Sequence, residues 1–367
     1  MNASKSNGLA SISIEHLYAG LILNEDIYNY NGTMMLVKKD TTLTDVLIEQ
    51  LKKFNGAEKN IRVSQKLYEQ LLERGIPQKL SQRYLEDTTK YTEIKNQTKS
   101  LITLAEITSR VPYEQVCNIN EHILERLKVT DPALLFQCIN GNNEVDEYLY
   151  RHSVNVALIN GLMGKWLNLP AQDITDLVTL GLVHDIGKVR VPNDVLNSSR
   201  KLTEREFEHV KRHTVYSHEM LLYTKEFPRE IANAARYHHE KMNGSGYPEG
   251  LAADDIPLPA RITAVSDVYD AMVSKRSYKN AQSPFGVLNQ MKEERLWGLD
   301  ITLVNVFTEQ MPRELLGKSV LLSNGMVAVV RHVNDMNIEY PIVEIEGDVI
   351  VTNKDLYCVS MVIDEDI

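Results

Sequence analysis

The histidines of this chain are concentrated in one region of helical periodicity. Seven of its ten histidines fall between His152 and His239. They lie inside residues 131 to about 310, where apolar residues recur at the spacing of buried helix faces. This pattern predicts a central domain built only of helices, and the clustering of histidines is the first indication of a functional site.

Five predicted helices of this region each place a potential metal ligand on the apolar face. The third opens with a capping box formed by Thr203 and Glu206, and its inward face carries His213. His209 and His218 do not follow that inward face, so we expect them at the surface. The inward-facing candidates are His152, His184, Asp185, His213, His238, His239 and Asp267.

A set of seven such side chains is hard to bury without a cation. A single inward histidine is more often a hydrogen-bonded core residue than a metal ligand. Several histidines and carboxylates in one helical core would leave unpaired groups, each costing about 1 to 3 kcal/mol. Divalent cations would satisfy these groups together, and mixed imidazole and carboxylate ligation suits Fe, Mn, Zn or Co.

Two pairs of adjacent candidates indicate two metals. Neighbouring residues on a helix diverge by about 100°, so His184 with Asp185, and His238 with His239, should serve two metals or bridge them. Two metals about 3.5 to 4 Å apart can generate a hydroxide at neutral pH and stabilise both oxygens of an in-line displacement at phosphorus. The pattern therefore indicates phosphoester hydrolysis.

The N-terminal region predicts a small α+β module over residues 1–75. Short β-like runs occur at Leu21–Leu23, Met34–Val37 and Ile61–Val63, and a helical pattern occurs at Thr42–Phe54. Residues 76–130 then show a charged helical pattern whose apolar positions are too sparse for a separate core. We expect a helical connector there, which could also form a homodimer.

A small β module is expected over residues 311–367, after the helical domain of residues 131–310. An Asn-Gly turn at Asn324 and Gly325 favours a hairpin. The expected strands are Ser319–Leu322, Met326–Val330, Tyr340–Ile345 and Val349–Thr352.

Charge and composition exclude some classes of function. The net charge of −10 argues against a broad DNA-binding surface. The longest apolar runs are far shorter than the roughly 20 residues of a membrane span, and the polar start lacks a secretion signal. Three scattered cysteines are typical of reduced thiols. We expect a cytoplasmic protein that binds neither DNA nor a membrane.

Several motifs occur in the order and spacing of a known family. They are His184-Asp185-Ile186-Gly187-Lys188, His238-His239-Glu240, the block from Gly244 to Leu251, Ile256-Pro257 and Ala260-Arg261-Ile262. Over about residues 146 to 290 the chain resembles the HD-GYP family of the HD phosphohydrolase superfamily, whose members hydrolyse the bacterial second messenger cyclic di-GMP. The resemblance implies a mainly α protein with a central all-helical HD-type metallohydrolase domain and two small flanking modules.

The resemblance also implies roles for individual residues. The family's seven metal ligands fall on the seven positions selected by periodicity. Lys188 matches a lysine near the scissile phosphate, and Arg276 with Lys279 matches a basic pair that contacts the phosphates of the ligand. Gly246 and Tyr247 lie in the Gly-Tyr-Pro loop, which is expected to contact substrate or a signalling protein partner.

The chain departs from the family at a few positions. Tyr148 stands where some relatives have a Glu that adds a third metal, so we expect two metals. Fe or Mn are the first candidates, with Zn, Co or Ni as alternatives. Asp185 would bridge the metals and act in catalysis with Lys188. Asn243 replaces the usual Asp, and Ser217 replaces a common Gly.

The predicted reaction opens cyclic di-GMP to linear pGpG and could continue to GMP. Two alternatives stay open at the level of the sequence. One is a cyclic di-GMP effector or adaptor with little turnover, and the other is an HD hydrolase of a different nucleotide, such as ppGpp.

Overall fold

A computed structural model provides the fold, and the chain divides into two compact units. The structure describes residues 9–13, 23, 26–28, 35–38, 41, 43, 47–48, 51, 60–64, 76–141, 148–196, 198, 200, 202–274, 284–293, 298–322, 326–335, 337–345, 347–354 and 356–362. The helical unit comprises residues 88–280 and 287–314. The strand-containing unit comprises residues 1–87, 281–286 and 315–367. The four domain boundaries expected from the sequence stay predictions.

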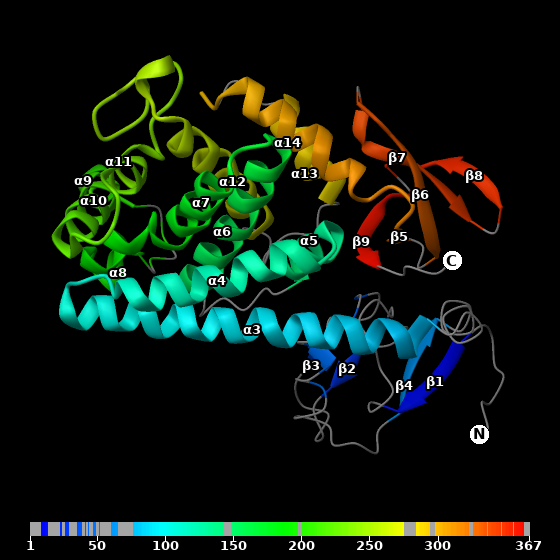
Figure 1. Cartoon of the computed structure of the whole chain (residues 1–367). Helices are drawn as coiled ribbons and strands as arrows, with labels where there is room; N and C mark the ends of the chain where they lie inside the picture. Colours follow the sequence, from blue (N-terminus) through cyan, green and yellow to red (C-terminus); the bar gives the residue numbers. More distant parts are fainter. Residues whose placement is uncertain are drawn as a thin grey trace. The chain divides into compact units, whose positions relative to one another are not determined.

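The helical unit is built from helices that vary widely in length (Figure 1). Its longer helices are α3 (Ile76–Thr108, whose first turns belong to the other unit), α4 (Tyr113–Val129), α5 (Pro132–Gly141), α6 (Tyr148–Trp166), α7 (Ala171–Val183), α10 (His213–Thr224), α12 (Leu258–Ser274), α13 (Pro284–Glu293, which also crosses between the units) and α14 (Ile301–Arg313). The shorter ones are η3 (Ile186–Arg190), α8 (Asn193–Leu196), α9 (Glu204–Lys211), α11 (Arg229–Tyr237) and η4 (Ala253–Asp255). Among the described residues, no helix combines the length and apolar character that a membrane span needs.

Helices α6 and α7 form the centre of this unit. They pack on each other, and α4, α12 and α14 add further contacts around α6. Gly181 of α7 permits a close approach, because a Cβ atom there would lie 2.4 Å from the Cα of Ala157 on α6. The two helices therefore bring their buried faces together at a distance that a larger residue would not allow.

An aromatic cluster fills the core where α5, α6, α12 and α14 meet. Phe136 lies 6.2 Å from both Trp166 and Tyr269, measured between ring centroids, and Tyr269 lies 4.9 Å from Phe307 in an edge-to-face arrangement. Phe136, Tyr269 and Phe307 are fully buried. These contacts hold α12 against α6 and so fix the relative positions of the polar residues on the two helices.

The third predicted helix is two helices in the structure. The predicted capping box is confirmed, since the Thr203 hydroxyl accepts a hydrogen bond from the Glu206 backbone N–H and the Glu206 side chain accepts one from the Thr203 backbone. This helix, α9, ends before Arg212, and a new helix, α10, begins at His213. The expectation of one continuous inward face was wrong at this point, because the chain turns just before the histidine.

The strand-containing unit holds three antiparallel sheets among its described residues. β1 (Leu9–Ser13) pairs with β4 (Asn60–Ser64), and β2 (Ile27–Tyr28) pairs with β3 (Met35–Val37). The third sheet has the order β8-β7-β6-β5-β9. Its strands are β5 (Ser319–Leu322), β6 (Val327–Asn334), β7 (Asn337–Ile345), β8 (Asp348–Val351) and β9 (Cys358–Val362).

The predicted mainly α fold with small flanking modules is confirmed. The hairpin expected near Ser319 is present as β5 and β6, although its Asn-Gly turn at residues 323–325 lies outside the described residues. The strand β9 was missed by the sequence reasoning. Within the helix expected at Thr42–Phe54, the described residues Leu47, Ile48 and Leu51 are helical and Leu43 is not.

Candidate functional site

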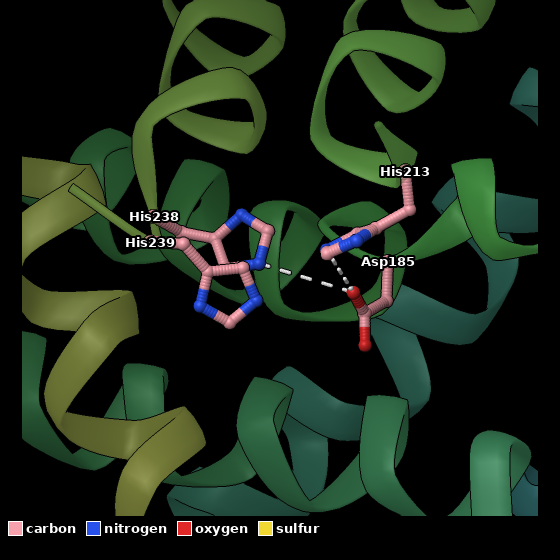
Figure 2. Close-up of side chains that lie close together, drawn as sticks. All are labelled: Asp185, His213, His238 and His239. Carbon is pink, nitrogen blue, oxygen red and sulfur yellow. Dashed lines mark ion pairs between the residues drawn. The ribbon is translucent and has the colours of Figure 1, made fainter. Parts of the chain in front are cut away.

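The predicted ligand side chains meet around Asp185 in the helical unit. One group that could hold a metal ion consists of Asp185, His213, His238 and His239, and a second consists of His152, His184 and Asp185. Figure 2 shows the first group, with Asp185 facing His213 and His238. The Asp185 carboxylate is buried and belongs to both groups, so its position suits a ligand shared by two cations.

Asp267 of α12 lies between the two groups. Its Oδ1 atom is 3.2 Å from Nε2 of His152, and its Oδ2 atom is 3.8 Å from Nδ1 of His239. All seven residues that periodicity selected are thus in one place. Arg276 and Lys279 lie outside the described residues, as does the side chain of Tyr148.

Each helix places its candidate metal ligand either at one of its ends or on one of its faces. His152 lies on the buried face of α6, and Asp267 lies on α12. His184 caps the end of α7, and the backbone leaves the helix at Asp185 before the short helix η3. His213 is the first residue of α10.

The histidine pair at the end of α11 differs from its expected arrangement. His238 caps the helix, so His239 lies beyond its last turn. Their ring centroids are only 4.1 Å apart, and both rings belong to the same group. The 100° divergence of neighbouring helical residues therefore does not apply here, because the helix has ended.

The hydrogen bonds of three histidines orient their second nitrogen toward Asp185. Nδ1 of His184 lies 2.9 Å from the Gly181 carbonyl, and Nδ1 of His213 lies 2.6 Å from the Val210 carbonyl. Nδ1 of His238 likewise lies 2.8 Å from the carbonyl oxygen of Ala235. A carbonyl oxygen can only accept, so Nδ1 carries the hydrogen and Nε2 presents a lone pair.

The nitrogen atoms that these three histidines turn inward are therefore acceptors. Nε2 of His213 is 3.1 Å from Oδ1 of Asp185, and Nε2 of His184 is 3.3 Å from Nε2 of His152. Among the described residues, Oδ1 of Asp185 and Nε2 of His213 and His238 are buried without a hydrogen-bond partner. Unpaired buried acceptors are costly unless a cation satisfies them, so the residues present fit a metal centre.

The pKa shifts of His238, His239 and Asp185 agree with two neutral imidazoles near a charged carboxylate. Burial lowers the pKa of His238 well below its ordinary value and lowers that of His239 to about 3. Burial would raise the pKa of Asp185, but Lys188 and the neighbouring histidines offset this and hold the pKa well below its usual range. Metal ligation requires this combination of protonation states.

Lys188 lies next to the shared carboxylate. Its ammonium group donates to Oδ2 of Asp185, and its side chain is 20% exposed. Because the lysine follows Asp185 by one turn of η3, the HD signature itself places the cation there. A cation in this position can also reach an anionic ligand that enters the site.

The Gly-Tyr-Pro loop is held over the histidines by a buried carboxylate. Oε1 of Glu240 accepts hydrogen bonds from the backbone N–H groups of Glu249 and Gly250, at 2.7 and 3.0 Å. The Tyr247 ring lies 4.8 Å from the His239 ring, and Gly246 packs directly on the Glu240 backbone. The loop therefore closes one side of the candidate site. Sequence reasoning quoted Glu240 as part of a motif but assigned it no role.

The departures from the family pattern at Ser217 and Asn243 have a structural explanation. The Ser217 hydroxyl accepts a hydrogen bond from the backbone N–H of Gly187, at 2.9 Å, and so ties α10 to the HD signature. The Asn243 side-chain oxygen accepts from both the backbone and the hydroxyl of Ser245. An Asp could accept the same bonds, so this change conserves the turn.

Two further polar residues in the helical unit were missed by the sequence analysis. Asp270 is fully buried, and its Oδ2 atom lies 2.7 Å from Nδ1 of His152. Asn155 donates to the other Asp270 oxygen at 2.6 Å. Asp270 follows Asp267 by three residues on α12, a spacing that places both on one face and could have identified it. His209 is exposed as predicted, and the half-buried His218 contacts Asn233 at 3.2 Å.

Known proteins resemble this chain over its helical part. Residues 142–303 match the family described as HD domain. A cyclic di-GMP phosphodiesterase of Pseudomonas aeruginosa is 37% identical over 187 residues, which are 50% of this chain and 44% of that protein. A 3′3′-cGAMP-specific phosphodiesterase of Vibrio cholerae is 30% identical over 191 residues, which are 52% of this chain and 37% of that protein. The chain thus matches less than half the length of either relative.

A solved structure resembles the fold. An HDG"Y"P protein from Bdellovibrio bacteriovorus superposes with a TM-score of 0.52 at 14% sequence identity, over 83% of this chain and 99% of that one. At this identity the likeness concerns the fold alone.

Proposed function

Because residues 142–303 belong to the HD domain family, as their motifs led us to expect, we propose that this chain is a metal-dependent phosphodiesterase that hydrolyses cyclic di-GMP. One observation carries the proposal. Buried acceptor atoms of Asp185, His213 and His238 face one another without a hydrogen-bond donor among the described residues. Such an arrangement suits divalent cations, and hydrolases of anionic phosphodiesters are one class of enzyme that uses them in this way.

Two divalent cations fit the two ligand groups, with Asp185 common to both. His213, His238 and His239 would hold one cation, and His152 with His184 the other. Asp267 adjoins both groups. Fe or Mn are the first candidates, with Zn, Co or Ni as alternatives. When bound, such cations polarise a phosphoryl oxygen and lower the pKa of water.

The chain's own residues would bind and orient the cyclic dinucleotide. Lys188 would donate to a non-bridging oxygen of the phosphate under attack, where negative charge grows. Arg276 and Lys279 would hold the phosphates, with Arg276 offering a bidentate contact. Tyr247 and Gly246, held by the Glu240 anchor, would cover the substrate and limit access of bulk water.

The main alternative substrate is 3′3′-cGAMP, which differs from cyclic di-GMP in one of its two bases. Some relatives are named cyclic di-GMP phosphodiesterases and others 3′3′-cGAMP-specific phosphodiesterases. The matches to the first kind, at 37% and 38% identity, are slightly closer than the matches to the second kind, at 30% to 36%, and so favour cyclic di-GMP by a small margin. A homodimer through residues 76–130 and a protein partner at the Gly-Tyr-Pro loop stay predictions.

The test compares the two substrates on one preparation. The full chain is purified without oxygen, its metals are counted, and hydrolysis of cyclic di-GMP and 3′3′-cGAMP is followed by chromatography. We expect two metals per chain, faster release of pGpG from cyclic di-GMP, and loss of both metal and activity in a His184→Ala, Asp185→Ala variant. The exposed His209→Ala is the matched control and should behave as the unaltered chain.

Each alternative has its own outcome. Binding of cyclic di-GMP without turnover would contradict the enzyme and favour an effector. Faster turnover of 3′3′-cGAMP would replace the substrate, and hydrolysis of ppGpp but of neither cyclic dinucleotide would replace the substrate class. Three metals per chain would contradict the expectation based on Tyr148.

A further inference from the structure

A buried chain of hydrogen bonds joins helix α3 to the candidate metal centre. The Tyr91 hydroxyl donates to the side-chain oxygen of Asn155 at 2.5 Å. The Asn155 amide donates to Oδ1 of Asp270 at 2.6 Å, and Oδ2 of Asp270 lies 2.7 Å from Nδ1 of His152. Tyr91, Asn155 and Asp270 are fully buried, so no water competes for these bonds.

The direction of each bond follows from the chemistry of the partners. The Asn155 oxygen can only accept, so the Tyr91 hydroxyl is the donor. The Asn155 amide nitrogen can only donate, so Asp270 accepts there. The second carboxylate oxygen of Asp270 then accepts the Nδ1 hydrogen of His152. The imidazole is left with its Nε2 lone pair toward Asp185 and Asp267, at 3.4 and 3.2 Å.

The other core histidines of the centre are oriented differently. His184, His213 and His238 donate to carbonyl oxygens of their own preceding turn, so their orientation is set locally. His152 instead depends on three other side chains, and Tyr91 lies outside the segment that matches the HD domain family. The orientation of His152 therefore depends in part on α3, a helix that precedes the segment matching the HD domain family.

We propose that Asp270, Asn155 and Tyr91 of α3 are positioning residues that fix the tautomer and ring orientation of His152. This inference rests on the proposed metal centre. Partners of this kind tune metal sites, and their loss costs about 10- to 100-fold in metal affinity. Loss of these partners should weaken one metal site and not the other, because His152 belongs to the group of His152, His184 and Asp185 and not to the other group.

The test measures Zn²⁺ binding by the full chain against a chromophoric chelator. We expect Asp270→Asn to weaken one of two Zn²⁺ sites by about 10- to 100-fold and to leave the other unchanged. An Asn amide could donate to Nδ1 and turn the protonated Nε2 toward the metal. Tyr91→Phe should weaken the same site by about 2- to 10-fold, as expected for one lost hydrogen bond. Thr98→Val is the matched control on α3, because it removes a buried hydroxyl that donates to the Ile94 carbonyl of its own helix.

A swapped pair separates positioning from general destabilisation. In the double variant Asn155→Asp, Asp270→Asn, the carboxylate introduced at position 155 accepts from Tyr91 and from the amide introduced at position 270. The oxygen of that amide accepts from His152. Every bond keeps a matched donor and acceptor, so the double variant should bind Zn²⁺ more tightly than Asp270→Asn alone. Nitrogen NMR of the metal-free chain should report hydrogen on Nδ1 of His152 in the unaltered chain and in the swapped pair.

The outcomes that overturn each step are distinct. Unchanged Zn²⁺ affinity in Tyr91→Phe would remove Tyr91 from the chain, and failure of the swap to restore affinity would contradict the directional role of Asp270. If NMR of the unaltered, metal-free chain finds the hydrogen on Nε2 of His152, the inference is wrong whether or not the chain binds metal. Absence of Zn²⁺ binding by the unaltered chain would instead overturn the proposed metal centre.

Discussion

At the scale of single residues, Glu240 shows how one buried carboxylate can organise a loop. Its Oε1 atom accepts two backbone N–H groups, from Glu249 and Gly250, and only 3% of its surface is exposed. The side chain of Glu249 is held as well, because Arg236 and Tyr237 donate hydrogen bonds to its carboxylate. The loop is therefore anchored both by Glu240 and by the last residues of α11, next to the histidines it covers.

Removal of this anchor should loosen the loop. Glu240→Ala leaves two N–H groups without their acceptor, at a cost of about 1 to 3 kcal/mol. We expect faster cleavage of the loop in limited proteolysis and a higher KM for the cyclic dinucleotide. Glu240→Gln keeps a carbonyl oxygen at the same position and is the control that should retain most of the protection. Equal protease resistance in Glu240→Ala would show that the loop is held by other contacts.

At the scale of elements, the approach of α6 and α7 sets the distance between two ligands. His152 of α6 and His184 at the end of α7 have ring centroids 5.2 Å apart. The helices can approach this closely because Gly181 has no Cβ atom. A methyl group there would meet the α6 backbone, which cannot move aside as a side chain could.

Substitution of this glycine should therefore disturb both stability and metal binding. We expect Gly181→Ala to lower the free energy of unfolding by about 1 to 3 kcal/mol, by overpacking, and to weaken the site that contains His152. Urea unfolding and chelator competition are the measurements. Gly164→Ala is the control, because its Cβ atom would first meet the Ile174 side chain, at 3.0 Å. Equal effects of the two substitutions would contradict this account.

The start of α9 gives a prediction about pH. Hydrogen bonds from Arg200 and Thr203 lower the pKa of Glu206 from 4.5 to about 2. A lowered carboxyl pKa stabilises the folded state above pH 4.5, and this contribution is lost as the pH falls toward 2. Glu206→Gln should therefore lower the free energy of unfolding near pH 7 and should have a smaller effect near pH 2, where much of the unaltered carboxyl is itself protonated. An equal loss of stability at pH 7 and at pH 2 in urea unfolding would contradict the ionised Glu206 carboxylate as its source.

At the scale of the whole molecule, the candidate metal centre connects distant parts of the helical unit. Its candidate ligands come from α6, the junction of α7 with η3, α10, the end of α11 and α12. Metal bound by all of these elements favours the folded state, because an unfolded chain cannot present the same ligands.

Removal of metal should therefore destabilise the chain. We expect dialysis against a chelator to lower the Tm, and Mn²⁺ added at about 100 times its Kd to restore about 2.7 kcal/mol. Differential scanning calorimetry measures both changes. The His184→Ala, Asp185→Ala variant is the control, since its Tm should not respond to added metal. A Tm that is equal with and without metal in the unaltered chain would contradict a site shared by several helices.

The sequence by itself determined which residues face the core and which chemistry they bring. Periodicity selected all seven candidate ligands, from His152 to Asp267, because one buried face of a helix is visible as a repeat along the chain. The flanking strands near Ser319 followed from alternation and from turn residues. Periodicity, alternation and turn residues are local signals, so a single sequence is enough to reveal them.

Only the tertiary structure decided which side chains meet. Tyr91 and Asn155 are 64 residues apart, and Asp270 is 118 residues from His152. A buried face says nothing about which opposite helix it touches, so no repeat could reveal these partners. The break before His213 and the end of α11 before His239 were missed for the same reason, since helix ends depend on packing as well as on local preference.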